Sequence, residues 1–148
     1  MRLEITADLL KQIHLHGEKA YPSEGAGFLL GNSSADWRVV SAILELSNAR
    51  EESAQHNRYL LSPQDMLRSE QEAARLGLDV IGVFHSHPDH PNQPSEFDRQ
   101  WAMPWFSYII TSVNQGTASG SRSWRLTDDR QAFEEEEIIQ TDQPSDNP

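Results

Sequence analysis

A largely apolar run from Leu78 to Phe84 constrains the fold of this 148-residue chain more than any other stretch. A strand with one solvated face alternates apolar and polar residues, whereas this run is apolar at almost every position. Such a run is expected of a central strand that is covered on both faces. It delivers His85 and His87 at its C-terminal end, where sites in open α/β sheets tend to form.

Two histidines and one acid after this run have the composition of a metal-binding site. His85 and His87 are two residues apart in an extended segment, so both imidazoles point to the same side. Asp98 follows eleven residues after His87, across a loop whose prolines limit its freedom. Two imidazoles and one carboxylate form a catalytic zinc set that leaves the fourth tetrahedral position for water.

Parts of this pattern also fit a purely structural role or a different metal site. Ser95-x-x-Asp98 fits a capping box at the start of a helix. His90 is an alternative third ligand, and two histidines with one carboxylate also describe the iron site of oxygenases. The chain contains no cysteine, which excludes zinc nucleobase deaminases in their usual form, because their motif requires P-C-x-x-C.

Apolar periodicity and turn residues predict an α/β fold, a single-domain mixed β-sheet flanked by about three helices. The helices are expected at 7–19, 63–76 and 96–102. The strands are expected at 22–32, 37–46, 58–61, 78–84, 105–113, 121–126 and 133–139. The last two strands are expected to form an edge hairpin, in which a run of glutamates opposes unwanted strand pairing.

Length and charge predict one domain at 1–139 and a disordered acidic tail at 140–148. Eight acids and one arginine between 128 and 148 supply −7 of the net charge of −11, so the rest carries about −4. A basic nucleic-acid footprint is absent from the sequence. No stretch approaches the roughly 20 apolar residues of a membrane span. Together with the lack of cysteine and of an apolar leader, this predicts a cytoplasmic protein without nucleic-acid or membrane partners.

The combined motif resembles that of the JAMM/MPN (Mov34/JAB) zinc metallopeptidases, in which an upstream glutamate precedes H-[ST]-H-P and S-x-x-D. Here these elements are Glu24, His85-Ser86-His87-Pro88 and Ser95-Glu96-Phe97-Asp98. The resemblance covers roughly residues 9–126 and implies an α/β/α sandwich like that of the cytidine deaminases. Many members have Cys where this chain has Ala26, a position that is not a zinc ligand.

The resemblance also implies a role for each motif residue. One zinc ion per chain would be held by His85, His87 and Asp98. Glu24 would act as general base and then as general acid, and Ser95 would donate a hydrogen bond to the oxyanion. Ser86 alternates with the histidines, so it is expected to face away from the metal and to have little functional role.

Family members cleave peptide or isopeptide bonds after the C-terminal Gly-Gly of ubiquitin or ubiquitin-like proteins, and a hydrolase of this kind is implied here. The short chain resembles compact bacterial and archaeal members, for which the expected partner is a β-grasp sulfur-carrier protein of the ThiS/MoaD type. A homodimer is compatible with this resemblance. Trp101, Trp105 and Phe106 are expected to pack in the core. The alternatives are a non-catalytic MPN scaffold and a JAB-type peptidase acting on other peptides.

Overall fold

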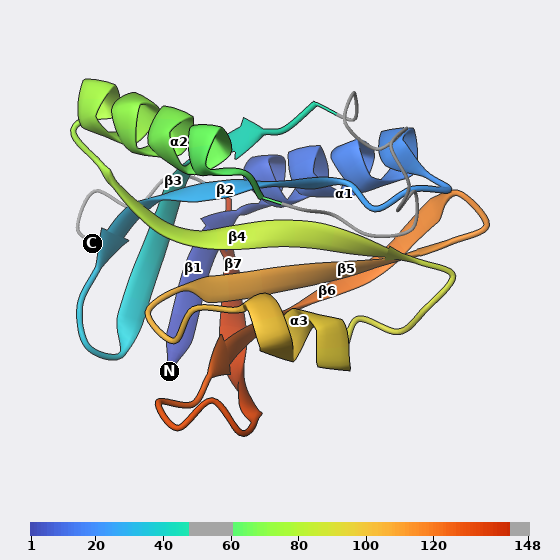
Figure 1. Cartoon of the computed structure of the whole chain (residues 1–148). Helices are drawn as coiled ribbons and strands as arrows, with labels where there is room; N and C mark the ends of the chain where they lie inside the picture. Colours follow the sequence, from blue (N-terminus) through green and yellow to red (C-terminus); the bar gives the residue numbers. More distant parts are fainter. Residues whose placement is uncertain (48–60, 143–148) are drawn as a thin grey trace.

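The computed structural model describes residues 1–47 and 61–142, which form seven strands and three helices (Figure 1). Their bounds are β1 Arg2–Thr6, α1 Ala7–Ala20, β2 Ala26–Ser33, β3 Trp37–Glu45, α2 Pro63–Leu76, β4 Asp79–Pro88, α3 Glu96–Trp101, β5 Ser107–Asn114, β6 Thr117–Leu126 and β7 Phe133–Thr141. The strand expected at 58–61 lies outside the described residues except for Leu61, which belongs to no strand. Among the described residues, no helix combines the length and the apolar character needed to cross a bilayer.

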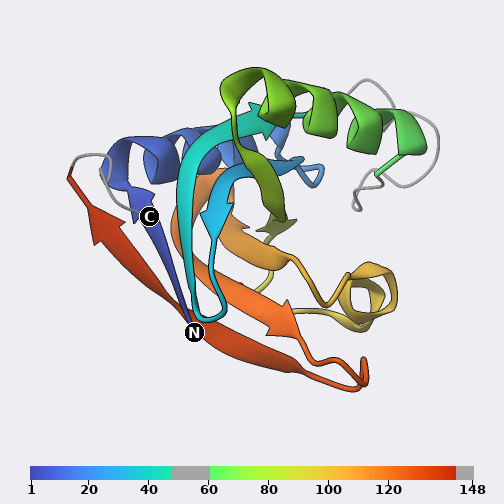
Figure 2. The ribbon, with the colours of Figure 1, turned by 90° about the vertical axis from the view of Figure 1, so that its left-hand side faces the viewer.

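The strands form one mixed sheet in the order β1-β3-β2-β4-β5-β6-β7, so the predicted fold class is confirmed. β4 is a central strand, antiparallel to β2 on one side and parallel to β5 on the other. The sheet curls beside α1, while α2 and α3 lie on its other face (Figure 2). β4 is therefore covered on both faces of the sheet.

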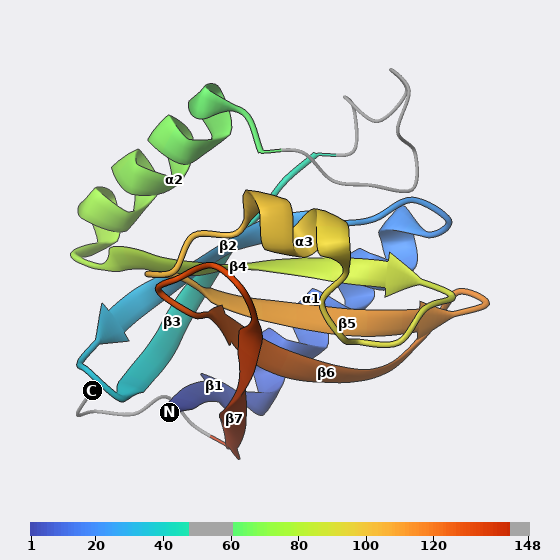
Figure 3. The same cartoon turned by 60° about the horizontal axis from the view of Figure 1, so that its bottom comes forward.

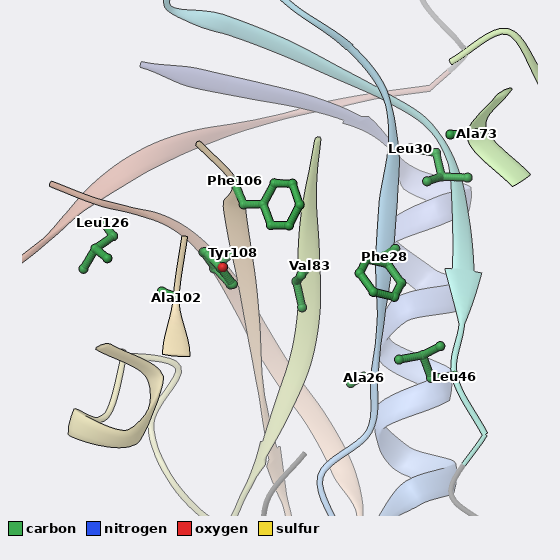
Figure 4. Close-up of a cluster of buried hydrophobic side chains, with 10 residues drawn as sticks. All are labelled: Ala26, Phe28, Leu30, Leu46, Ala73, Val83, Ala102, Phe106, Tyr108 and Leu126. Atoms are coloured by element: carbon green, nitrogen blue, oxygen red, sulfur yellow. The ribbon is translucent and has the colours of Figure 1, made fainter. Parts of the chain in front are cut away.

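Two apolar clusters cover β4, as its continuous apolar sequence predicts. Val83 faces the first cluster, which includes Phe28 of β2, Ala73 of α2 and Ala102 just after α3 (Figure 4). Phe84 faces the second cluster, together with residues of α1, β1 and β5. Both side chains are at most 1% exposed. Because β4 is packed on both faces, the side chains at its end are held in fixed positions.

The sheet closes into a barrel, which corrects the prediction of an edge hairpin at the C-terminal end. β7 pairs with β6, and it also pairs in parallel with β1, from Arg2 opposite Glu137 to Thr6 opposite Thr141. The strand at residues 2–6 was not predicted from the sequence. β7 also runs through Thr141, so the first two residues of the expected tail belong to the sheet, and residues 143–148 lie outside the described part of the chain.

A buried polar cluster accounts for the one glutamate of this strand that faces inward. Glu136 is 1% exposed, and its carboxylate accepts hydrogen bonds from the hydroxyls of Ser107 (2.7 Å) and Ser123 (2.9 Å) and from Arg125 Nε (2.6 Å). Arg38 of β3 donates to the same Ser107 hydroxyl (2.9 Å). Side chains from four strands thus meet at Glu136, and the ion pair makes its burial tolerable.

Replacing Glu136 is therefore expected to destabilise the closed barrel. Glu136→Gln removes the buried charge that faces the half-buried Arg125, and loss of one partner of such an ion pair lowers the free energy of unfolding by about 3 kcal/mol. Urea unfolding monitored by tryptophan fluorescence measures this change. Glu134→Gln, at an exposed position of the same strand, is the matched control and should leave the unfolding midpoint unchanged. Equal midpoints for the two variants would contradict the assigned role of the cluster.

Candidate metal centre and active site

β4 carries both predicted histidine ligands, and its pairing with β2 and β5 holds their backbone in place. The strand extends past Phe84 to Pro88, so the histidines lie within it and not beyond its end. His85 is opposite Ala26 of β2, and His87 is opposite Ser112 of β5. The two side chains share one face because they are two residues apart. The loop after β4 then turns back, so that α3 lies over β4 and β5 (Figure 3).

α3 places the third predicted ligand. Ser95 is the N-cap residue, its hydroxyl accepts from the Asp98 backbone N–H at 3.0 Å, and the Asp98 carboxylate accepts from the Ser95 N–H at 2.8 Å. This is the capping box that the S-x-x-D spacing predicts. It fixes the side chain of Asp98, which is 5% exposed, against the end of β4. Helix capping and placement of the carboxylate are thus served by the same two hydrogen bonds.

The three predicted ligands converge in a buried group. Asp98 Oδ1 lies 3.6 Å from His85 Nε2, and Asp98 Oδ2 lies 3.1 Å from His87 Nε2. One possible metal-ligand atom from each residue lies within 4.8 Å of the other two. His90, the alternative ligand, is not part of this group; its side chain is exposed at the rim of the neighbouring cavity. Among the described residues, the group that could hold a metal ion therefore includes Asp98 and not His90.

The tautomer of His87 shows that this group suits a cation. His87 Nδ1 lies 2.8 Å from the Pro91 carbonyl oxygen, which can only accept, so Nδ1 carries the proton. In the neutral ring, Nε2 then presents a lone pair toward the Asp98 carboxylate. Two acceptors at this separation repel each other unless a proton or a metal ion lies between them. Two imidazoles and a carboxylate are a ligand set of catalytic zinc sites, so the residues fit this ion.

The charge states favour metal binding as well. Burial lowers the pKa of His85 to about 4, against the opposing charge of Asp98, so its ring is neutral at pH 7. Burial disfavours the charged form of Asp98, but the two histidines and the Ser95 N–H outweigh it and hold its pKa well below the usual range. For His87, burial is likewise outweighed by the hydrogen bond and charge of Asp98, which raise its pKa. Protons therefore compete with a metal chiefly at His87.

A cavity of about 350 Å³ lies beside this group of ligand atoms, and the two other predicted site residues, Glu24 and Ser95, line it. It is lined by Glu24, His87, His90, Pro91, Gln93, Pro94 and Ser95. Glu24 precedes β2 and is 61 residues away from His85 in the chain. Its negative charge contributes to raising the pKa of His87, which reflects their proximity. The upstream glutamate of the motif and the serine of S-x-x-D thus share one cavity wall with a metal ligand.

Two aromatic residues near the site are exposed, although the sequence predicts that they pack in the core. Phe106 is buried as expected, but Trp101 is 63% exposed and Trp105 is 64% exposed, so their assignment to the core is wrong. Trp101 lies at the end of α3 and borders an apolar hollow of about 220 Å³, lined by Leu61, Met66, Phe97, Trp101, Met103, Phe106 and Tyr108. Phe97 lies next to Asp98 in the chain, so this hollow adjoins the metal centre through α3.

Ser86 was expected to contribute little, and the structure shows a contact that sequence reasoning missed. Its side chain does point away from the two histidines, but its hydroxyl accepts a hydrogen bond from the Gly25 N–H at 2.8 Å. Gly25 directly follows Glu24. The only signal for this contact in the sequence is the small polar residue between the two histidines. The alternation of side chains in a strand predicts the direction in which Ser86 points, but it does not predict which residue Ser86 contacts.

Comparisons with known proteins agree with the motif. Residues 6–127 match the family described as prokaryotic homologs of the JAB domain. The chain is 33% identical to a desampylase of Haloferax volcanii over 116 residues, which are 75% of this chain and 81% of that protein. It is 28% identical over 114 residues to a probable TtuB-protein conjugate cleaving protease of Thermus thermophilus, covering 75% of this chain and 72% of that protein.

Solved structures show the same fold. A protein of Salinibacter ruber is 42% identical, with a TM-score of 0.74, over 96% of this chain and 92% of that one. A JAB1/MPN domain protein of Archaeoglobus fulgidus is 20% identical, with a TM-score of 0.56, over 94% of this chain and 99% of that one. The family match spans most of the chain and includes all the motif residues. The chain therefore belongs to the prokaryotic JAB-domain family.

Proposed function

We propose that the protein is a zinc-dependent peptidase that hydrolyses the bond after the C-terminal Gly-Gly of a ubiquitin-like or sulfur-carrier protein. The observation that carries this proposal is the cavity in which Glu24 and Ser95 lie beside the His85, His87 and Asp98 group. The names of two relatives, a desampylase and a probable TtuB-protein conjugate cleaving protease, support a hydrolase that acts on protein conjugates.

The buried donor group is assigned to zinc. His85, His87 and Asp98 are the ligands, and His87 is oriented by its hydrogen bond to the Pro91 carbonyl. A zinc ion bound there would supply Lewis-acid chemistry, polarising a carbonyl oxygen and lowering the pKa of water toward about 7. The protein's part is to present neutral imidazoles and an ionised carboxylate, the states in which these side chains bind a metal.

Glu24 is assigned the proton transfers. It takes a proton from the attacking water as the water oxygen bonds to the carbonyl carbon, and it returns that proton to the nitrogen as the C–N bond breaks. Its place in the wall of the same cavity as His87 supports this role. A carboxylate that is not itself a ligand can accept the proton without altering the donor group.

Ser95 is assigned to the oxyanion. Its hydroxyl accepts the hydrogen bond from the Asp98 N–H, which occupies one lone pair and leaves the hydroxyl hydrogen available. Ser95 is exposed at the cavity wall. There its hydroxyl hydrogen can be donated to the negatively charged oxygen of the tetrahedral intermediate. Helix capping and oxyanion stabilisation therefore use different parts of one hydroxyl.

A protein substrate suits the surroundings of the site. The cavity wall includes Pro91 and Pro94, and a Gly-Gly segment without side chains can approach such a wall closely. The apolar hollow bordered by Trp101 lies next to α3, and exposed apolar surface of this kind commonly marks contacts with other proteins. We assign the cavity to the extended C-terminal tail of the substrate and the hollow to its folded body.

The test is incubation of the zinc-loaded protein with β-grasp carrier proteins extended past Gly-Gly, followed by intact-mass analysis. The expected product is the carrier ending in Gly-Gly. A short peptide with the same tail should be cleaved more slowly, because it lacks a body to bind the hollow. A carrier that is bound but left intact would support a non-catalytic scaffold, and equal cleavage of unrelated peptides would favour a peptidase of other specificity. Either result would overturn the proposal.

A further inference from the structure

The segment that carries Glu24 is held by a residue that points away from the metal ligands. Gly25 N–H donates to the Ser86 hydroxyl at 2.8 Å, and Ser86 N–H donates to the Gly25 carbonyl at 3.0 Å. Both polar backbone groups of Gly25 are therefore bonded to Ser86. Gly25 follows Glu24 directly, and Ser86 lies between His85 and His87. The chain is thus tied to the metal-binding strand immediately after Glu24.

This contact lies in a tightly packed space between β4 and α1. Ser86 is 2% exposed. A β-carbon added at Gly17 of α1 would lie 3.1 Å from Ser86 Cβ, and one added at Gly25 would lie 3.0 Å from Ala20 Cβ. Neither position has room for a larger side chain without a shift. A small side chain with a hydroxyl satisfies the buried Gly25 N–H, which would otherwise lose its hydrogen-bond partner at a considerable cost in stability.

We infer that Ser86 is a positioning residue for Glu24, an inference that rests on the proposed role of Glu24 as the general base. The Glu24 carboxylate can move only about its own side-chain torsions when the chain beside it is fixed. Ser86 belongs to the same strand as two ligands, so it links the position of the base directly to the position of the metal. A misplacement of about 1 Å of a reacting group can cost about 100-fold in rate.

Ser86→Ala tests this inference. It removes the acceptor for Gly25 N–H, and we expect kcat to fall about 10-fold to 100-fold with KM and metal content unchanged. Ser86→Thr keeps the hydroxyl and should restore most of kcat. The matched control is Ser69→Ala on α2, because Ser69 is also buried but its hydroxyl bonds Met66 O within its own helix, at 2.7 Å. Wild-type kcat for Ser86→Ala, or an equal loss for Ser69→Ala, would overturn the inference.

A second variant, Gly25→Ala, tests the inference if Ser86→Ala does not fold. Gly25→Ala keeps the Ser86 hydroxyl, but its new methyl would lie 3.0 Å from Ala20 Cβ, so the Glu24 segment or α1 must shift where they meet. It should lower kcat in the same way, with metal still bound. Wild-type kcat for Gly25→Ala would show that a shift at this contact does not affect the reaction, which overturns the inference.

A double-mutant comparison separates the positioning role from a general structural one. If Ser86 acts through Glu24, then Ser86→Ala should cause no further loss in a chain that already carries Glu24→Gln. Multiplied losses would show that Ser86 acts independently, which overturns the inference. Full activity of Glu24→Gln alone would instead overturn the role of general base that the proposed function assigns to Glu24. An impaired Glu24→Gln beside a fully active Ser86→Ala would remove the positioning role and leave the proposed function intact.

Discussion

Glu24→Gln is expected to keep about one zinc ion per chain and to lower kcat about 10²-fold to 10⁴-fold, the range for loss of a general acid–base group. Glutamine has nearly the same shape as glutamate, but its amide cannot take a proton from water and return it to the leaving nitrogen. Glu24 lines the cavity but is not part of the buried donor group, so metal binding should be retained.

Metal content by mass spectrometry and cleavage of an extended carrier protein by intact-mass analysis check this result together. Glu96→Gln is the matched control, because Glu96 is an exposed acid directly after Ser95 and its carboxylate bonds Arg99. It should change neither metal content nor kcat appreciably. A fully active Glu24→Gln would mean that another group carries the proton. Loss of metal from Glu24→Gln would instead show that Glu24 supports the ligands.

His85→Ala is expected to abolish both stoichiometric zinc binding and cleavage. It removes one of three donors from a buried group, and even the loss of a residue that merely orients a ligand lowers metal affinity about 10-fold to 100-fold. His87 and Asp98 alone would leave a site with two ligands. Activity should fall to the level of wild-type protein that has been treated with a chelator.

His90→Ala provides the control for this variant. His90 is exposed at the cavity rim and lies outside the donor group, so its replacement should retain one zinc ion per chain. Retention of full metal by His85→Ala together with loss by His90→Ala would reverse the assignment of the ligands. For the wild-type protein, cleavage should disappear after chelation and return when zinc is added. Undiminished activity without metal would contradict the proposed mechanism.

The local elements that build the site could be predicted from the sequence. Ser62 and Asp65 form a capping box where the helix at 63–76 is predicted to begin, and Gly77 ends this helix in the left-handed conformation at φ 72°. Ser95 and Asp98 likewise form the box that opens α3. These features depend on hydrogen bonds between residues at most five positions apart. The apolar run that precedes His85 carries similar information, since burial on both faces leaves a continuous apolar pattern.

The relation between distant segments was decided by the tertiary structure. β1 and β7 lie at opposite ends of the chain, and their pairing turns the expected edge into a closed barrel with Glu136 inside. Trp101 lies at the end of a helix and resembles a core residue in sequence, yet it is largely exposed.

The site shows the same division. The sequence by itself determined that His85 and His87 share one side of a strand, that Ser86 faces the other side, and that Asp98 begins a helix. The fold decided that Gly25 meets Ser86 and that Glu24 therefore lies beside the ligands. The physical reason is that side-chain direction follows from local backbone geometry, whereas the neighbour that a side chain meets depends on how the whole sheet packs.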